Sequence, residues 1–163
     1  MNNLFLVTFV MVSSLVYSQA EKDSYLLDAG IIKDSINTLT FKSKTEFQSF
    51  VQVFEEKKGF RPQWLIVDSS GKLLKHKLDQ YIKECGKGDV YNLKKKYYKK
   101  LPNIYELSAL FNESLAKPTK GHYTVVFMWM KGLGIYNQHT FETYHVWKEN
   151  SNINFYFLNL KPE

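Results

Sequence analysis

The sequence predicts an α/β protein, a three-layer sandwich in which helices cover both faces of a central mixed sheet. Two segments, 123–130 and 153–160, are largely apolar on both faces, which is typical of parallel strands covered on both sides. The segment between them, 137–149, repeats apolar residues at helical spacing, so the three segments form a βαβ unit. A third apolar run, 64–67, precedes turn residues typical of an antiparallel hairpin, and the sheet therefore mixes both strand directions.

The amino-terminal segment, residues 1–20, predicts export. It contains no Lys, Arg, Asp or Glu, has an apolar run from Leu4 to Val12 interrupted by one threonine, and ends in small residues. These are features of a secretory signal peptide, and we expect cleavage after Ser18 or Ala20. An uncleaved membrane anchor is the alternative, although the apolar run is short for a bilayer span. We expect the mature protein to be secreted or periplasmic, with no transmembrane helix.

The remaining residues, 21–163, suit a single domain with one core. Aromatic residues make up 16% of the chain and supply ample apolar area for that core. Cys85 is the only cysteine, so no disulfide forms within one chain. In an oxidising compartment an odd thiol either stays buried or links two chains, and a Cys85-linked dimer is the second of these outcomes.

The domain begins with a predicted strand and helix. Alternation over 37–41 indicates a short strand. Ser43 precedes Glu46 by three positions, the spacing of a capping box in which the Ser hydroxyl accepts from the backbone N–H of Glu46. A helix should therefore start there, and Gly59 should end it. Its apolar stripe consists of Phe47, Phe50, Val51 and Phe54.

A hairpin is predicted next. The run 64–67 has no polar position, which places it in the middle of the sheet. Residues 68–71 supply turn chemistry, and 72–76 return as a second strand.

Asparagines mark the starts of two further helices. Asn103 caps a helix. Its apolar face consists of Ile104, Leu107, Leu110 and Phe111. Asn137 is expected to cap the helix of the βαβ unit. The inner side of that helix consists of Phe141, Tyr144 and Trp147.

Two parts of the chain resemble secreted thioredoxin-like proteins. The segment 61–72, in which a proline precedes an apolar strand, an Asp-containing turn and a Gly-Lys pair, looks like their hairpin. The run 126–129, followed by a loop and a helix, resembles their first strand and active-site helix. The resemblance implies a cis peptide bond between Arg61 and Pro62. It also implies a degenerate active-site loop, in place of the family's Cys-x-x-Cys, formed by Lys131, Gly132, Leu133 and Gly134.

The order of these parts departs from the family, since the hairpin that normally follows the βαβ unit precedes it here. A circularly permuted thioredoxin-like sheet accommodates this order, and so does a chain that keeps only pieces of the fold. Another three-layer or two-layer α/β arrangement also fits the predicted elements.

The sequence carries no recognisable motif for catalysis, a cofactor or a metal. Dithiol exchange needs a second thiol besides Cys85, so disulfide oxidoreductase activity is not expected, and a one-cysteine mixed disulfide is the remaining thiol chemistry. Gly132 and Gly134 lack the third glycine of a dinucleotide fingerprint, because Asn137 stands there. The four histidines lack metal-ligand spacing. We therefore predict no catalytic residues, no cofactor and no metal, with an enzyme of unrecognised chemistry as an open alternative.

One stretch, 83–100, concentrates positive charge. It holds seven lysines against one glutamate and one aspartate, and so carries most of the formal net charge of +6. Lysine beside tyrosine can bind anionic groups through charge while the rings cover apolar surface. The candidate residues are Lys94, Lys95, Lys96, Tyr97, Tyr98, Lys99 and Lys100. The alternative is a solvated connector in which Leu93, Tyr97 and Leu101 pack at helical spacing.

These features predict two classes of function. The first is an exported, non-catalytic thioredoxin-like protein that acts through protein contacts in the cell envelope or outside the cell. The alternative is a basic module that binds anionic lipids, glycans or acidic proteins through 83–100. Nucleic acid is not an expected partner. Binding by the lysines should weaken steeply with salt, whereas apolar docking should change little.

Overall fold

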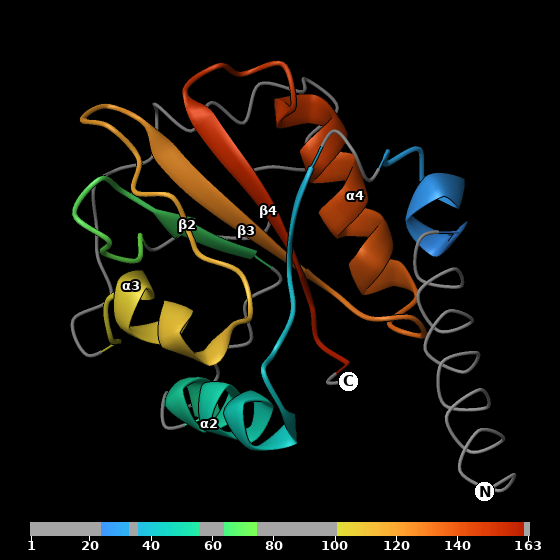
Figure 1. The fold of residues 1–163 in the computed structure, drawn as a ribbon. Coiled ribbons are helices and arrows are strands. Elements are labelled where there is room, and N and C mark those ends of the chain that lie inside the picture. Colours follow the sequence, from blue (N-terminus) through green and yellow to red (C-terminus); the bar gives the residue numbers. More distant parts are fainter. Residues whose placement is uncertain (1–23, 33–35, 56–63, 75–100, 162–163) are drawn as a thin grey trace, which may run out of the picture. The chain divides into compact units, whose positions relative to one another are not determined.

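The computed structural model describes residues 24–32, 36–55, 64–74 and 101–161 (Figure 1). The chain divides into two compact units, Met1–Ile36 and Asn37–Glu163, and each is described by itself. Within the described residues, no helix has both the length and the apolar character needed to cross a bilayer.

In the first unit, a helical turn over 24–28 ends in a Schellman motif. Gly30 has a φ of 71°, in the left-handed region that glycine favours. Its N–H donates to the carbonyl of Leu27 (2.8 Å), and the N–H of Ile31 donates to the carbonyl of Leu26 (2.9 Å). These bonds satisfy carbonyls that the end of the helix would otherwise leave unpaired.

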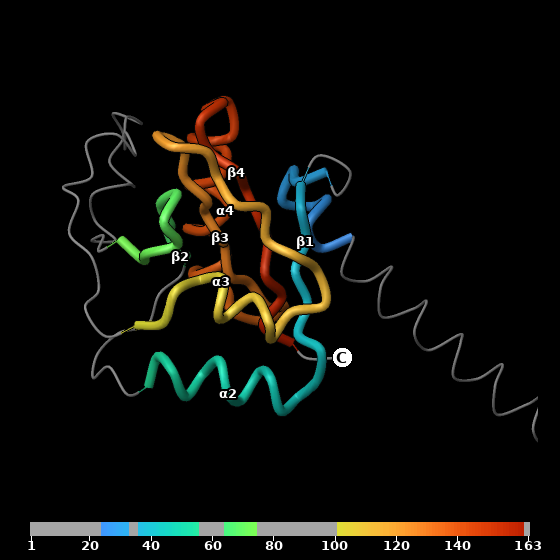
Figure 2. Tube along the Cα trace, turned by 60° about the vertical axis from the view of Figure 1, so that its left-hand side comes forward, coloured from blue at the N-terminus to red at the C-terminus, as the bar shows by residue number. Residues whose placement is uncertain are grey.

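The second unit is built on a four-stranded sheet with the order β1-β4-β3-β2. Figure 2 shows the four strands in this order, which are β1 (Asn37–Leu39), β4 (Ile153–Asn159), β3 (Tyr123–Trp129) and β2 (Trp64–Val67). β4 is parallel to both β1 and β3, whereas β2 is antiparallel to β3. The predicted α/β class and the mixed sheet are therefore confirmed.

The two carboxyl-terminal strands lie where the sequence places them. β3 and β4 pair in parallel, with Val126 opposite Tyr156, and every residue of β3 is buried. The helix between them, α4 (Ile135–Trp147), completes the predicted βαβ unit. A strand that is apolar at every position needs cover on both faces, and the central position of β3 provides it.

Among the described strands β2 lies at one end of the four-strand order, and not between two of them as the predicted position in the middle of the sheet implies. Its residues are all buried nonetheless, because the chain turns back along its outer side. The N–H of Leu74 donates to the carbonyl of Ile66 (2.8 Å), and Val67 forms a bridge with Leu73. The predicted hairpin is thus present as far as residue 74, and residues 75–76 lie outside the described part of the chain.

Helices cover both faces of the sheet (Figure 1). On the α4 face, the ring of Phe127 lies 6.1 Å from that of Tyr144 and 6.5 Å from that of Trp147. On the other face lie α2 (Lys44–Glu55), α3 (Ile104–Leu107) and the short 3-10 helix η4 (Ser108–Leu110). Neighbouring residues of β3 therefore pack into different layers, since Val126 and Met128 belong to the core under α2 and α3.

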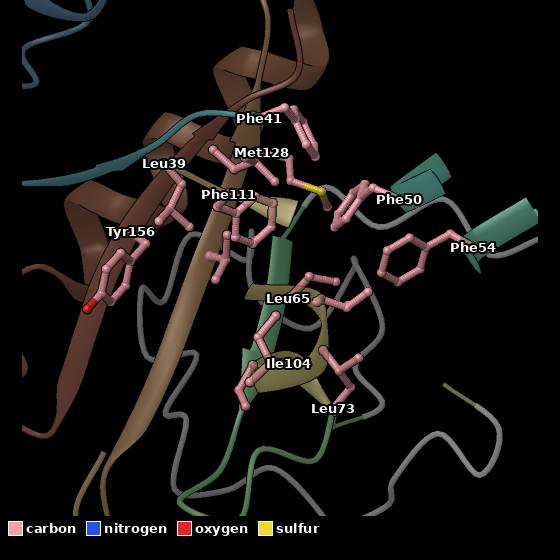
Figure 3. Close-up of a cluster of buried hydrophobic side chains, with 14 residues drawn as sticks. Leu39, Phe41, Phe50, Phe54, Leu65, Leu73, Ile104, Phe111, Met128 and Tyr156 are labelled. Carbon is pink, nitrogen blue, oxygen red and sulfur yellow. The ribbon is translucent and has the colours of Figure 1, made fainter. Parts of the chain in front are cut away.

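The core under α2 and α3 includes Phe41 (Figure 3). Its ring makes edge contacts with the rings of Phe47, Phe50 and Phe111 at 5.3, 5.3 and 5.4 Å. Edge-to-face pairs of this kind add to the stabilisation from buried area. Phe50 and Phe54 of the predicted α2 stripe are buried, whereas Phe47 and Val51 are half-buried.

The start of α2 is at the predicted place, but its cap differs in detail. The hydroxyl of Ser43 accepts from the N–H of Thr45 (3.1 Å) rather than from that of Glu46. The same hydroxyl donates to the carboxylate of Glu46. This hydrogen bond lowers the pKa of Glu46, because it favours the ionised carboxylate. The predicted end of the helix at Gly59 lies outside the described residues.

α3 is shorter than the apolar pattern predicts. Asn103 caps it as expected, with its Oδ1 accepting from the N–H of Tyr105 (2.9 Å). The α-helix ends at Leu107 and continues as η4, because Phe111 must be extended to form its bridge with Phe41. The predicted face is thus divided between an α-helical turn and a 3-10 turn.

Candidate functional site

The predicted degenerate active-site loop connects the carboxyl end of β3 to the start of α4. We call residues 130–134 the β3–α4 loop. Gly132 and Gly134 have φ values of 99° and 53°, a region that favours glycine. No atom lies within 4 Å of the position that a Cβ would take at either glycine. The loop therefore leaves its backbone open to close approach by another molecule.

Asn137 holds this loop against β3, and its predicted role as the helix cap is wrong. The helix begins at Ile135, with Gly134 as the capping residue. Asn137 lies in the first turn and is 1% exposed. Its Nδ2 donates to the carbonyl of Met130 (2.8 Å), and its Oδ1 accepts from the N–H of Met130 (3.4 Å). A buried amide needs such partners, and here they fix the start of α4 to the end of β3.

Two further bonds hold the same region. The N–H of Leu133 donates to the carbonyl of Met130 (3.1 Å), which closes the turn. The N–H of Leu160 donates to the carbonyl of Trp129 (2.8 Å), so the chain after β4 also supports the end of β3. The turn within the β3–α4 loop is thus closed, and the end of β3 that precedes it is held by the chain that follows β4.

Two large apolar side chains project from the start of α4. Ile135 is 61% exposed and Tyr136 is 59% exposed. The inner side of the helix is as predicted, since Phe141, Tyr144 and Trp147 are buried. Sequence reasoning missed the exposed pair, and helical spacing signals only Ile135, because Tyr136 lies eight positions before Tyr144 and so falls near the face of that buried set. We call Ile135 and Tyr136 the apolar pair.

The remaining predicted site residues lie outside the described part of the chain. They are Pro62 with its implied cis bond, Cys85, and the candidate anion-binding residues Lys94–Lys100. The structure therefore places the β3–α4 loop but leaves the basic stretch as a prediction from the sequence.

The chemistry of the β3–α4 loop suits contact with another molecule. Lys131 is the one charged side chain of this loop, and the loop holds no carboxylate, thiol or imidazole. Across the described residues, no group of three His, Cys, Asp or Glu is placed to hold a metal ion. Comparison of the chain with known proteins finds no matching family model, no matching curated protein and no matching solved structure.

Proposed function

We propose that this chain is an exported, non-catalytic thioredoxin-like protein that acts through protein contacts at the β3–α4 loop. The observation that carries the proposal is the apolar pair, Ile135 and Tyr136, exposed on a segment that buried Asn137 fixes to the sheet. Exposed apolar side chains that lie next to each other, as these two do, are a feature of interaction sites. Export rests on the signal-peptide features of residues 1–20.

The arrangement of the strands supports the thioredoxin-like part of the proposal. The two segments that resemble the family, the hairpin strand and the βαβ unit, are far apart in the sequence. In the sheet β2 lies directly beside β3, with Trp64 opposite Phe127. This adjacency is what a permuted thioredoxin-like sheet requires, because the hairpin and the βαβ unit then share one sheet in either chain order.

The energetics favour contact at the apolar pair. Full burial of a large apolar side chain contributes about 1.5–3 kcal/mol, so the two side chains offer a substantial part of a binding free energy. The hydrogen bonds of Asn137 to Met130 already order the backbone beneath them. A partner therefore loses little free energy to ordering of the loop on binding.

Site-specific photocrosslinking in the cells that export the protein tests this proposal. A photoreactive benzoylphenylalanine is placed at Gln138, which is exposed and follows the apolar pair on α4. The control position is Glu149, which is exposed beyond the other end of the helix. We expect a discrete protein adduct from Gln138 that disappears in the variant Ile135→Ser/Tyr136→Ser, and none from Glu149. Equal adducts from both positions, or an adduct that survives the double substitution, would overturn the proposal.

A further inference from the structure

We propose that the carboxyl edge of the sheet binds an extended acidic peptide segment that carries a large apolar side chain. The carboxyl edge is defined by the ends of the parallel strands β1, β3 and β4. The inference rests on the proposed function, since it names the chemistry of the partner that the same surface would bind.

Lysines follow all three of these strands. Parallel strands end at the same edge of a sheet, so the residues that follow β1, β3 and β4 gather there. Lys42 follows β1, Lys131 follows β3 and Lys161 follows β4, while Lys44 opens α2. All four are exposed, and together they give this edge a row of positive charge.

Carboxylates near this edge are already engaged by groups of the same fold. Glu113 accepts from the N–H of Thr40 (2.7 Å) and from its hydroxyl (3.0 Å). Glu46 accepts from the hydroxyl of Ser43. The amino-terminal ends of α2 and α4 also lie at this edge, and helix amino termini carry partial positive charge. Both carboxylates stay charged, but the four lysines outnumber them, and this excess favours a negatively charged partner.

The spacing of the strands favours a peptide over a single small anion. Neighbouring strands lie about 4.8 Å apart, so the ends of β1 and β3, on either side of β4, are separated by about 10 Å. One phosphate or carboxylate cannot itself span that separation, and it would meet lysines from both ends only if their flexible side chains converged on it. About three residues of an extended chain can span it, because each contributes about 3.3 Å. Carboxylates at intervals along one peptide therefore match the lysines.

The apolar pair is the reason why the proposed peptide carries a large apolar side chain. Ile135 and Tyr136 lie close in sequence to Lys131, so an apolar side chain of the peptide can dock beside its carboxylates. The open space beside Gly132 and Gly134 admits the peptide backbone. An anionic membrane has a similar charge, but it offers no backbone to enter the open loop, and the peptide is therefore favoured.

The test is a fluorescence-anisotropy titration of the full chain with a labelled peptide in which glutamates flank a central phenylalanine. The variant Lys44→Gln/Lys131→Gln/Lys161→Gln should bind this probe about tenfold more weakly, since each exposed ion pair contributes a factor of about two. The control has the same change of charge at the opposite edge. It is Lys117→Gln/Lys120→Gln/Lys148→Gln, three exposed residues that precede β3 or follow α4, and it should bind as the wild type does.

Each outcome decides the inference. Equal weakening in both lysine variants would overturn it, because binding would then follow net charge alone. A probe with glutamines in place of glutamates that binds equally well would overturn the acidic preference, yet leave the proposed protein contacts intact. Preferential binding to anionic phosphatidylglycerol vesicles would replace the peptide with a membrane. Failure of the proposed function is seen separately, as a missing adduct from Gln138.

Discussion

Replacing Gly71 with alanine should destabilise the protein through Asn103, a residue distant in the sequence. Gly71 has a φ of 80° and packs against the cap of α3. An added Cβ would lie 2.5 Å from Nδ2 and 2.6 Å from Cγ of Asn103, and would also meet its Oδ1. The Asn103 side chain would have to move. It would then lose its bond to the N–H of Tyr105 (2.9 Å) and its bond to the carbonyl of Ser70 (2.7 Å).

The magnitude follows from these three effects. The left-handed backbone costs alanine about 1 kcal/mol. Loss of a helix amino-terminal cap costs about 1 kcal/mol. Loss of the second hydrogen bond costs about another 1 kcal/mol. Gly71→Ala should therefore lower the free energy of unfolding by about 3 kcal/mol. The matched control is Gly121→Ala, with a φ of 89° and no atom within 4 Å of the added Cβ, which should lower it by about 1 kcal/mol.

Urea unfolding followed by tryptophan fluorescence measures both changes. A double-mutant cycle with Asn103→Ala makes the test sharper, because Gly71→Ala and Asn103→Ala remove the same two hydrogen bonds. The double variant should be no less stable than Gly71→Ala alone. A loss at Gly71 that equals the loss at Gly121, or additive losses in the cycle, would refute the reasoning.

Three further predictions concern single side chains. Asn137→Ala should lower the free energy of unfolding by about 2 kcal/mol, because it removes the buried amide that bonds to the end of β3, and urea unfolding measures this loss. The Ser43 hydroxyl lowers the pKa of Glu46 below its ordinary value of 4.5. The ionised carboxylate therefore stabilises the fold fully above pH 4.5, and this contribution is lost as the pH falls through the lowered pKa of the folded state. The Tm of the wild type should therefore exceed that of Glu46→Gln near neutral pH, and the difference should narrow on acidification. Tyr156→Phe should lower the free energy of unfolding by about 1 kcal/mol, because the Tyr156 hydroxyl accepts from a backbone N–H (2.9 Å). Tyr105→Phe should lower it by less than about 0.5 kcal/mol, because the Tyr105 hydroxyl bonds to no described residue.

Each of these predictions has a control variant or an outcome that would contradict it. Gln138→Ala changes an exposed neighbour of Asn137 and should stay within about 0.5 kcal/mol of the wild type. A difference in Tm between the wild type and Glu46→Gln that is the same at every pH would contradict the linkage. Equal losses in the two tyrosine variants would contradict the assignment of their hydroxyl groups.

Local patterns were enough to predict the βαβ unit and the start of α2. β3 and β4 lack a polar face, and only a covered parallel pair satisfies that pattern. Ser43 marks the start of α2 because a hydroxyl at this position can bond to the free amides of the first turn. In both cases the interactions that decide the structure lie within a few residues or repeat along one segment.

Other features depend on contacts that a local pattern does not contain. An asparagine near the start of a helix suits a cap, but Asn137 instead bonds to the end of the preceding strand. A run such as 64–67 is equally apolar in a central strand and in an outer one covered by its own hairpin, as β2 is. The exposure of Ile135 and Tyr136 depends on where the first turn of α4 lies, which Gly134 fixes. In each case a hydrogen bond or a turn a few residues away, rather than the spacing of apolar residues, decided the structure.

The most direct measurement is made on Ile135→Ser/Tyr136→Ser, because the apolar pair is assigned to protein contact and not to folding. Its free energy of unfolding should stay within about 0.5 kcal/mol of the wild type, since both side chains are exposed. The photocrosslinked adduct from Gln138 should disappear in the same variant. A variant that unfolds more readily by about 2 kcal/mol and still forms the adduct would show that these side chains serve the fold instead.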